Sequence, residues 1–497
     1  MKPFAKERRI RLGRQRGQAI PFALVFLVVG AASLYLAFNS SQLTYAKTKL
    51  QDTADAAAYS VGILQARDLN FAAYTNRAMV ANQVAAAQFI SLKSWIDEAS
   101  MTYKNDHWYD TFIEDTAAVS LPWTAPKKLG YPILLAAKRV IDSTAPLVTK
   151  GLDGLNKILS AEQQVYHDSI VVQIPLVADE IATANEPNTH ATKTYFATRG
   201  ALALASSLKF ASRVTPAGKS GEDRFADVVT DKTTLDGFVQ AREGLRDPFV
   251  ASTIEECPGF SFIAAAHSHR GGTQLRPDKS GWEGLDATDV DGGWICYFEI
   301  GAVGWAIIDK AGYGGAANGP GGSYSGTQGY GGFSNYDSAL TSGLTEIAAR
   351  YQYGVGPGRS MSRGGGLQPY LELARQSTPA DGTDFNRAPA IAVEVQRGSS
   401  SVSTTDRIGV GTGDLQASDG TAQNQMRAIA SASAYFIRPD DPRSGVAGAL
   451  SSVAAWHRGD NKWEYPSLFN PYWQSSLVPT SLVAIEAADA AQAAGAP

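Results

Sequence analysis

Residues 19–38 read AIPFALVFLVVGAASLYLAF, an uncharged apolar run near the start of a 497-residue chain. A helix of this length reaches about 30 Å, which matches the hydrocarbon core of a bilayer. The run is longer than the apolar region of a cleaved signal peptide, roughly 7–15 residues, and no clean A-x-A cleavage site follows it. We therefore expect a single transmembrane helix over residues 17–38.

The leader before this run, residues 1–16, is strongly basic, with seven Lys or Arg residues against one acid, Glu7. Basic flanks stay on the cytoplasmic side, so the bulk of the chain is expected outside the cytoplasm. The leader's net charge is +6 and that of the whole chain is -4, so residues 17–497 carry -10. An acidic exported part argues against nucleic acid as a partner and against an extended basic membrane-binding face. The lipid bilayer is an expected partner because of the apolar run.

The segment after the apolar run predicts a long helical stem. Residues 39–104 contain no proline and one glycine, Gly62. Apolar residues recur every three or four positions, a spacing typical of one helix face; they are Leu43, Ala46, Leu50, Ala54, Ala57, Val61 and Leu64. Breaks are conceivable at Asn70 and Asn76.

Two more helical regions are expected, at about 133–183 with interruptions at Pro146 and Pro175, and at about 193–213. The sequence therefore predicts a helical stalk or bundle over residues 39–215.

The rest of the chain, residues 216–486, predicts a mixed, strand-containing distal domain, so the fold class is α+β. Strand-like runs lie at 260–263, 294–298 and 390–397, and residues 428–438 suit a strand or a short helix. Residues 312–332 hold ten glycines, which predicts a flexible loop near 311–366. The Ala-rich end, residues 487–497, is expected to be a disordered tail.

Candidate site residues are few. Cys257 and Cys296 either form a disulfide, which an extracytoplasmic location permits, or are two unrelated buried thiols. His267 and His269 share a strand face, with acids nearby in sequence at Asp278, Glu283, Asp286 and Asp289. That group is either a metal site or, as we favour, a polar loop edge.

The chain lacks G-x-S-x-G and H-E-x-x-H motifs and a phosphate-binding loop. We therefore predict no catalytic residue, no cofactor and no bound metal, and a protein that is not an enzyme.

The flanks of the apolar run carry a resemblance. Arg16-Gly17-Gln18-Ala19 precedes it, and Leu50-Gln51-Asp52-Thr53-Ala54-Asp55-Ala56-Ala57-Ala58 follows it. This arrangement resembles the N-terminal region of TadE/TadG-type proteins of the Flp (tight adherence) pilus-assembly system. The segment LFNPYWQ, residues 468–474, is also similar to one found in large pilus-assembly proteins of this sort.

The resemblance implies a single-pass protein of the bacterial cytoplasmic membrane, with a cytoplasmic N-terminus and a periplasmic or extracellular bulk. Its expected role is structural, by packing against other pilus-assembly membrane proteins. Gly17 and Gln18 mark a possible processing site. The glutamate that processed pilins carry five residues after the glycine is Phe22 here, and the D-x-S-x-S metal motif of some relatives is absent. The alternative is a membrane-tethered extracytoplasmic enzyme or ligand-binding protein with an unrecognised site.

Overall fold

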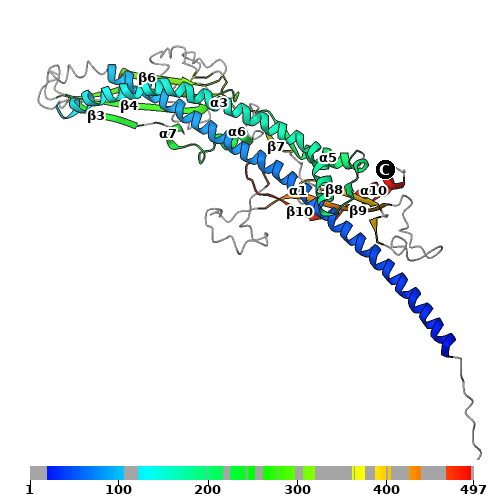
Figure 1. Ribbon diagram of the computed structural model, residues 1–497. Coiled ribbons are helices and arrows are strands. Elements are labelled where there is room, and N and C mark those ends of the chain that lie inside the picture. Colours follow the sequence, from blue (N-terminus) through cyan, green and yellow to red (C-terminus); the bar gives the residue numbers. More distant parts are fainter. Residues whose placement is uncertain are drawn as a thin grey trace, which may run out of the picture.

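One very long helix, α1 (Ala19–Asn105), is the spine of the computed structural model. At 1.5 Å per residue its 87 residues span about 130 Å. The structure describes residues 19–105, 121–197, 199–216, 224–240, 242, 244–251, 261–276, 278–296, 306–319, 361–362, 364–374, 387–398, 401–403, 425–437 and 466–493. In Figure 1 the first turns of α1, in deep blue, project from the elongated body, and the rest of the helix runs through it.

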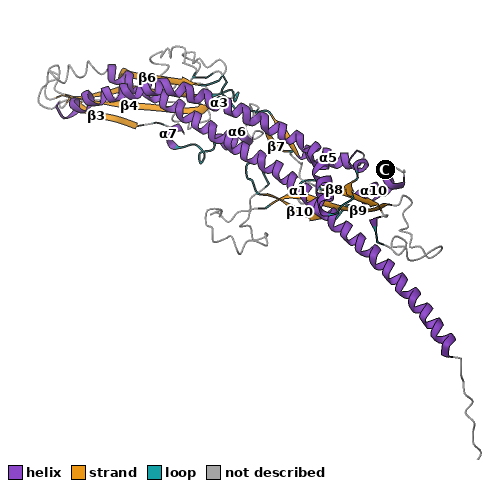
Figure 2. Ribbon diagram, in the orientation of Figure 1, coloured by secondary structure: helices purple, strands orange, loops and turns teal. Residues whose placement is uncertain are grey.

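A second long helix, α3 (Leu121–Asn185), runs back beside α1 in the opposite direction. The interruptions expected at Pro146 and Pro175 are wrong, since α3 is one helix through both positions. A proline removes one backbone donor from a helix, but most helical stability in a folded protein comes from tertiary packing, and α3 packs along α1. The pair confirms the predicted helical stalk (Figure 2).

Two small antiparallel sheets lie on the half of this pair nearer the projecting end of α1. The first has the order β1-β8-β9-β10 and the second pairs β2 with β7. Their strands are β1 (Thr189–Ala191), β8 (Ile391–Gly398), β9 (Gln425–Phe436), β10 (Trp473–Val478), β2 (Ala211–Val214) and β7 (Tyr370–Leu373). The runs at 390–397 and 428–438 are thus both strands, and their alternating small residues allow close packing.

The third sheet lies at the far end of the helix pair, with the antiparallel order β3-β4-β5-β6. Its strands are β3 (Gly244–Ala251), β4 (Ser261–Leu275), β5 (Trp282–Cys296) and β6 (Ala306–Ala317). The glycine-rich stretch, expected to be a loop, therefore begins as strand: residues 312–317 pair with β5, and residues 320–360 lie outside the described part. Gly314 is required there, because a Cβ on it would lie 2.0 Å from the Ser94 carbonyl oxygen of α1.

The shorter helices fill the gaps between these layers. They are α4 (Lys193–Ala197), α5 (Arg199–Phe210), α6 (Arg224–Thr230), α7 (Gly237–Gln240) and α10 (Leu482–Ala493). Residues 487–493, expected to be disordered, belong to α10, where alanine's high helix propensity and the burial of Ala487 and Ala488 keep them helical. The fold is therefore α+β, as predicted.

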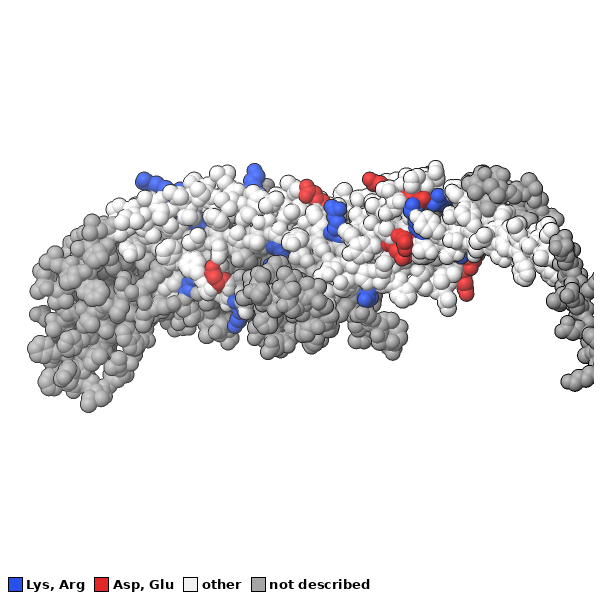
Figure 3. Space-filling model, turned by 60° about the horizontal axis from the view of Figure 1, so that its bottom comes forward, with Lys and Arg blue, Asp and Glu red and all other residues white. Residues whose placement is uncertain are grey.

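On the face drawn in Figure 3, acidic and basic side chains are scattered among wide uncharged areas. Neither sign forms a continuous patch over the part of this face that is described.

Candidate functional site: a membrane helix and the side chains that tie the body to it

The projecting start of α1 is the most exposed apolar surface in the described chain. Its large side chains face solvent, including Phe26 at 75% and Leu34 at 74% exposure. None of the most apolar 18-residue window is buried, and α1 is the one described helix that is long and apolar enough to cross a membrane. A surface of this kind is stable only in an apolar medium or against other helices.

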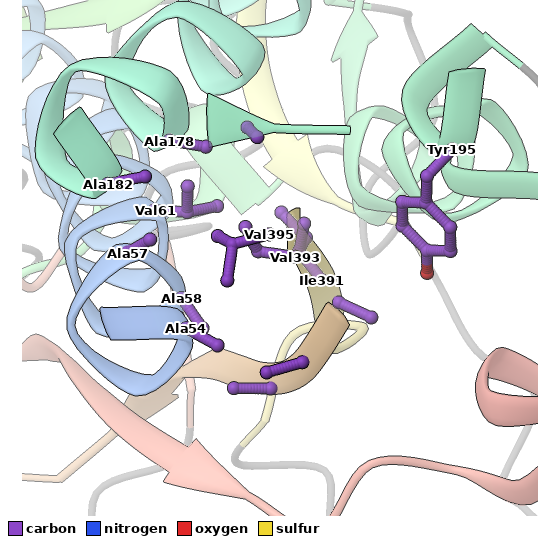
Figure 4. Close-up of a cluster of buried hydrophobic side chains, with 14 of the residues drawn as sticks. Ala54, Ala57, Ala58, Val61, Ala178, Ala182, Tyr195, Ile391, Val393 and Val395 are labelled. Atoms are coloured by element: carbon purple, nitrogen blue, oxygen red, sulfur yellow. The ribbon is translucent and has the colours of Figure 1, made fainter. Parts of the chain in front are cut away.

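The residues just beyond this exposed run change from surface to core. Leu50, Ala54, Ala57 and Ala58 are buried to within 1% of complete. They pack against Ala178 and Ala182 of α3 and against β8 and β9, as Figure 4 shows for the side chains around Val393. Alanine at these positions lets the backbones of α1, α3 and the sheet approach closely. We call residues 50–58 the buried seat, because here α1 packs against α3, β8 and β9.

Polar side chains of α1 then bind the backbones of segments from the end of the chain. Gln65 accepts a hydrogen bond from the Ala434 amide at 2.8 Å and donates to the Pro389 carbonyl at 3.1 Å. Asn70 accepts from the Trp473 amide and donates to its carbonyl, at 3.0 and 2.8 Å. Each pair joins residues more than 300 positions apart, so α1 organises the late strands.

Asn76 is the most buried of these side chains, with no exposed surface. Its amide donates to the carbonyls of Leu371 (2.9 Å) and Leu468 (2.7 Å), and its oxygen accepts from Gln163 of α3 at 2.9 Å. Asn70 and Asn76 therefore do not break α1, as was conceivable from their residue type. Their side chains serve as attachment points, and their backbones remain helical.

Nearer the far end, α1 contributes to a buried charged cluster with the third sheet. Arg242 donates to both carboxylate oxygens of Asp286, at 2.7 and 2.8 Å. The His269 ring lies 3.2 Å from Asp286 and 3.5 Å from Glu98 of α1. Thr288 donates to Glu98 and lies 3.0 Å from His269. All five side chains are at least 94% buried.

The electrostatics of this cluster favour its charged form. Burial opposes a charge on His269, but its contacts with Asp286 and Glu98 outweigh burial and raise its pKa. Burial also opposes the charge on Asp286, yet the Arg242 guanidinium and His269 hold the pKa of that carboxyl below its ordinary value. A buried and paired cluster of this kind holds the helix on the sheet, and it offers no surface to a substrate.

Of the four acids noted near the histidines in the sequence, Asp286 lies against His269, Glu283 and Asp278 make other contacts, and the side chain of Asp289 is not described. Asp286 lies in the cluster, Glu283 accepts from Gln274 at 3.1 Å, and Asp278 accepts within its own turn from Ser280. His267 and His269 stand at alternate positions of β4, hence on one face, although only the side chain of His269 is described. In the described ranges no group of three or more His, Cys, Asp or Glu residues is arranged to hold a metal ion.

The remaining predicted positions lie partly outside the described residues. Gly17, Gln18 and Cys257 are among those not described, while Cys296 ends β5, opposite Ser261. The disulfide and the processing site therefore stay predictions. The sequence analysis did not predict the roles of Glu98 and Arg242. For Glu98 the available signal was a charged residue on the buried face of α1, whereas Arg242 lies between α7 and β3 and carried no pattern.

The sequence of the first part of α1 matches the model of a known family. Residues 17–68 match the model of the Tad family, described as Flp pilus-assembly TadE/G-like. The N-terminal segment is TadE/G-like. No curated protein and no solved structure matches the chain.

The matched segment contains both the exposed membrane-length run and the buried seat at 50–58, and it ends at Asp68. The resemblance read from the flanks of the apolar run is confirmed over about a tenth of the chain. A Tad-type segment supports a role related to Flp pilus assembly.

Proposed function

We propose that the protein is a single-pass, membrane-anchored structural component of Flp/Tad-type pilus assembly. Its leader lies in the cytoplasm and its body lies in the periplasm or outside the cell. It works by packing against other membrane proteins of the pilus machinery and carries out no chemistry.

The observation that supports this proposal best is the position of the TadE/G-like segment. It covers the helix from the exposed apolar run to the buried seat for the body, so one rigid element joins membrane and body. Along its buried part this helix packs on α3 and contacts strands of all three sheets, so the body is attached to α1 over most of its length. That arrangement suits a protein that holds or aligns others at the membrane surface.

The mechanism follows from the two environments of α1. In the bilayer, small residues such as Gly30, which has open space around its Cβ position, permit close contact with neighbouring helices. Outside the bilayer, α3 and the sheets pack around α1, so the outer surface of α3 and the far sheet are available to other proteins. The protein would then recognise other pilus proteins through contacts both inside the bilayer and outside it.

The test starts with anchoring. Leu27 and Val28 lie in the middle of the apolar run, where each Arg costs about 2.5–3.5 kcal/mol of insertion free energy. We expect the L27R/V28R double variant to lose the protein from carbonate-washed membranes, and the L27I/V28I control to keep it there. A wild-type chain recovered as a soluble cytoplasmic protein would contradict the proposal.

The second part of the test concerns assembly. A strain without this chain should display few or no pili, and the full chain should restore them while the Arg variant should not. Normal pilus numbers in the deletion strain would contradict a role in assembly, even if the protein is anchored as expected.

A further inference from the structure

Helix α3 has a second apolar face that nothing in the described chain covers. One face is buried against α1 and the segments beside it, at Ala145, Thr149, Asp153, Asn156, Ser160, Gln163, His167, Ile170, Ile174, Ala178 and Ala182. On the opposite face, large apolar side chains stand in solvent, among them Ile133 at 71%, Leu147 at 72% and Val165 at 69% exposure. Single exposed apolar residues are ordinary, but an aligned row along a helix marks an interaction surface.

The row has the spacing of a coiled-coil seam. Steps of four and three residues alternate without interruption along Ile133, Ala137, Val140, Thr144, Leu147, Gly151, Gly154, Ile158, Ala161, Val165, Asp168 and Val172. We call these twelve residues the α3 seam. A strict seven-residue repeat keeps a seam in register with a second helix wound around the first. Asp168 is the one charged member.

Two glycines at the centre of the seam point to a helix that approaches closely. A Cβ added at Gly151 or at Gly154 would meet nothing within 4 Å. Glycine inside a helix costs about 1 kcal/mol relative to alanine, and no contact of the described chain explains why it is used here. Small residues one turn apart permit short distances between helix backbones, so this part of α3 suits close packing by a second helix.

We propose that the α3 seam packs against the α3 seam of a second copy of this chain, in parallel. The parallel orientation rests on the proposed function, because two copies anchored in one membrane by α1 hold their seams at the same height. The arrangement has two-fold symmetry, the commonest symmetry of homo-oligomers.

The area and charges of the seam fit such a pair. From Ile133 to Val172 the seam is about 60 Å long, and with a helix width of about 10 Å it buries on the order of 600 Å² per copy. The total of about 1,200 Å² reaches the range of specific interfaces. Two charged residues flank the seam: Lys157 lies one position before the seam residue Ile158, and Glu162 lies four positions after Ile158. In a parallel coiled coil these two positions of opposite charge meet across the interface.

Cysteine crosslinking of the full chain in membranes tests the pair. V140C and V165C each place a thiol in the seam, whereas R139C places one on an exposed position beside it. We expect mild oxidation to yield covalent dimers with V140C and with V165C, above the level of the wild-type chain, which keeps Cys257 and Cys296. R139C should remain at the wild-type level.

Both seam positions must crosslink to themselves, since residues 25 apart are about 37 Å apart on a helix and an antiparallel pair cannot join both. Dimers at one position alone, heavier products containing another protein, or no product would overturn the proposal. Thiols that resist maleimide labelling without forming dimers would show that the chain covers its own seam, which also overturns it.

A second variant separates assembly from folding. G151L adds bulk where the single chain has open space, so its unfolding temperature should not fall, while crosslinking through V165C should drop several-fold. Unchanged crosslinking would contradict close approach at Gly151. Membrane fractionation of the same samples reports on anchoring separately, so a failed dimer does not count against the anchored role.

Discussion

At the scale of single residues, the body is held by buried polar side chains whose partners lie far away in the sequence. His167 of α3 is an example: its Nδ1 lies 2.7 Å from Asp68 of α1 and its Nε2 lies 3.1 Å from the Leu208 carbonyl. Burial is the largest single influence and opposes a charge on this ring, but the hydrogen bonds to Asp68 and the Leu208 carbonyl and the nearby carboxylate charges together outweigh it and raise the pKa of His167. His167 and His269 therefore both favour their protonated forms in the folded protein.

The raised pKa of His167 makes the free energy of unfolding depend on pH. A histidine whose pKa is higher folded than unfolded stabilises fully below its unfolded value, about 6.5, and loses this contribution as pH rises through the folded value. We expect the free energy of unfolding to fall as pH rises from 6.5 into the alkaline range. Urea denaturation at a series of pH values measures it.

The matched variants for this prediction are H167Q and D68N, each of which removes one side of the pair. Both should flatten the pH dependence relative to the wild-type chain. A slope that both variants leave unchanged would assign the effect to other groups. Asp153, whose pKa burial raises to about 6, acts at lower pH, between about 3.8 and 6, and so does not confuse the result.

At the scale of elements, α1 and α3 differ in the space around their glycines: α1 packs closely against a sheet, whereas one face of α3 is open. Gly62 lies where α1 meets the sheet: a Cβ there would be 2.3 Å from Ser475 Oγ and 2.9 Å from the Ala432 Cβ. Gly151 of α3 has open space at the same test position. These two glycines therefore lie in opposite environments: a side chain at Gly62 would clash, whereas a side chain at Gly151 would meet open space.

The two glycines predict opposite effects of the same substitution. G62A should destabilise the body by about 1–3 kcal/mol, because the extra methyl group overpacks the contact of α1 with β9 and β10. G151A should stabilise α3 by up to about 1 kcal/mol through helix propensity. Chemical denaturation of both variants tests the pair, and a stabilising G62A would show that the close contact is wrong.

At the scale of the whole molecule, anchor and body share one helix but have separate energetics. The apolar run makes no buried contact with the body, whereas the core begins at Ala46 and continues along α1. Successive cores then follow the helix, around Ala72 with Trp473 and around Ile90 with Trp282.

This separation predicts how truncations behave. A chain that starts at Asn39 should be soluble and should unfold at nearly the temperature of the full chain in detergent, because it retains every core contact of α1. A chain that starts at Ala66 loses Leu50, Ala57 and Val61 and should not fold. Circular dichroism with thermal melts distinguishes them. Loss of folding in the first truncation would mean that the anchor stabilises the body.

The sequence by itself determined the apolar run, its helical continuation and part of four strands, β4, β5, β8 and β9, because those depend on local composition and period. It did not predict the other six strands of the described chain, whose short or glycine-rich sequences carry no strand pattern of their own. The three-to-four-residue spacing of apolar side chains also predicted the packing face at 50–58, and the resemblance of this segment indicated the family. Only the tertiary structure decided that Asn76 is an attachment point, that Glu98 and His269 share a buried cluster, and that glycines 312 and 314 lie in a strand against α1. Each depends on partners more than 150 residues away, and a local pattern cannot specify contacts that form only when distant segments meet.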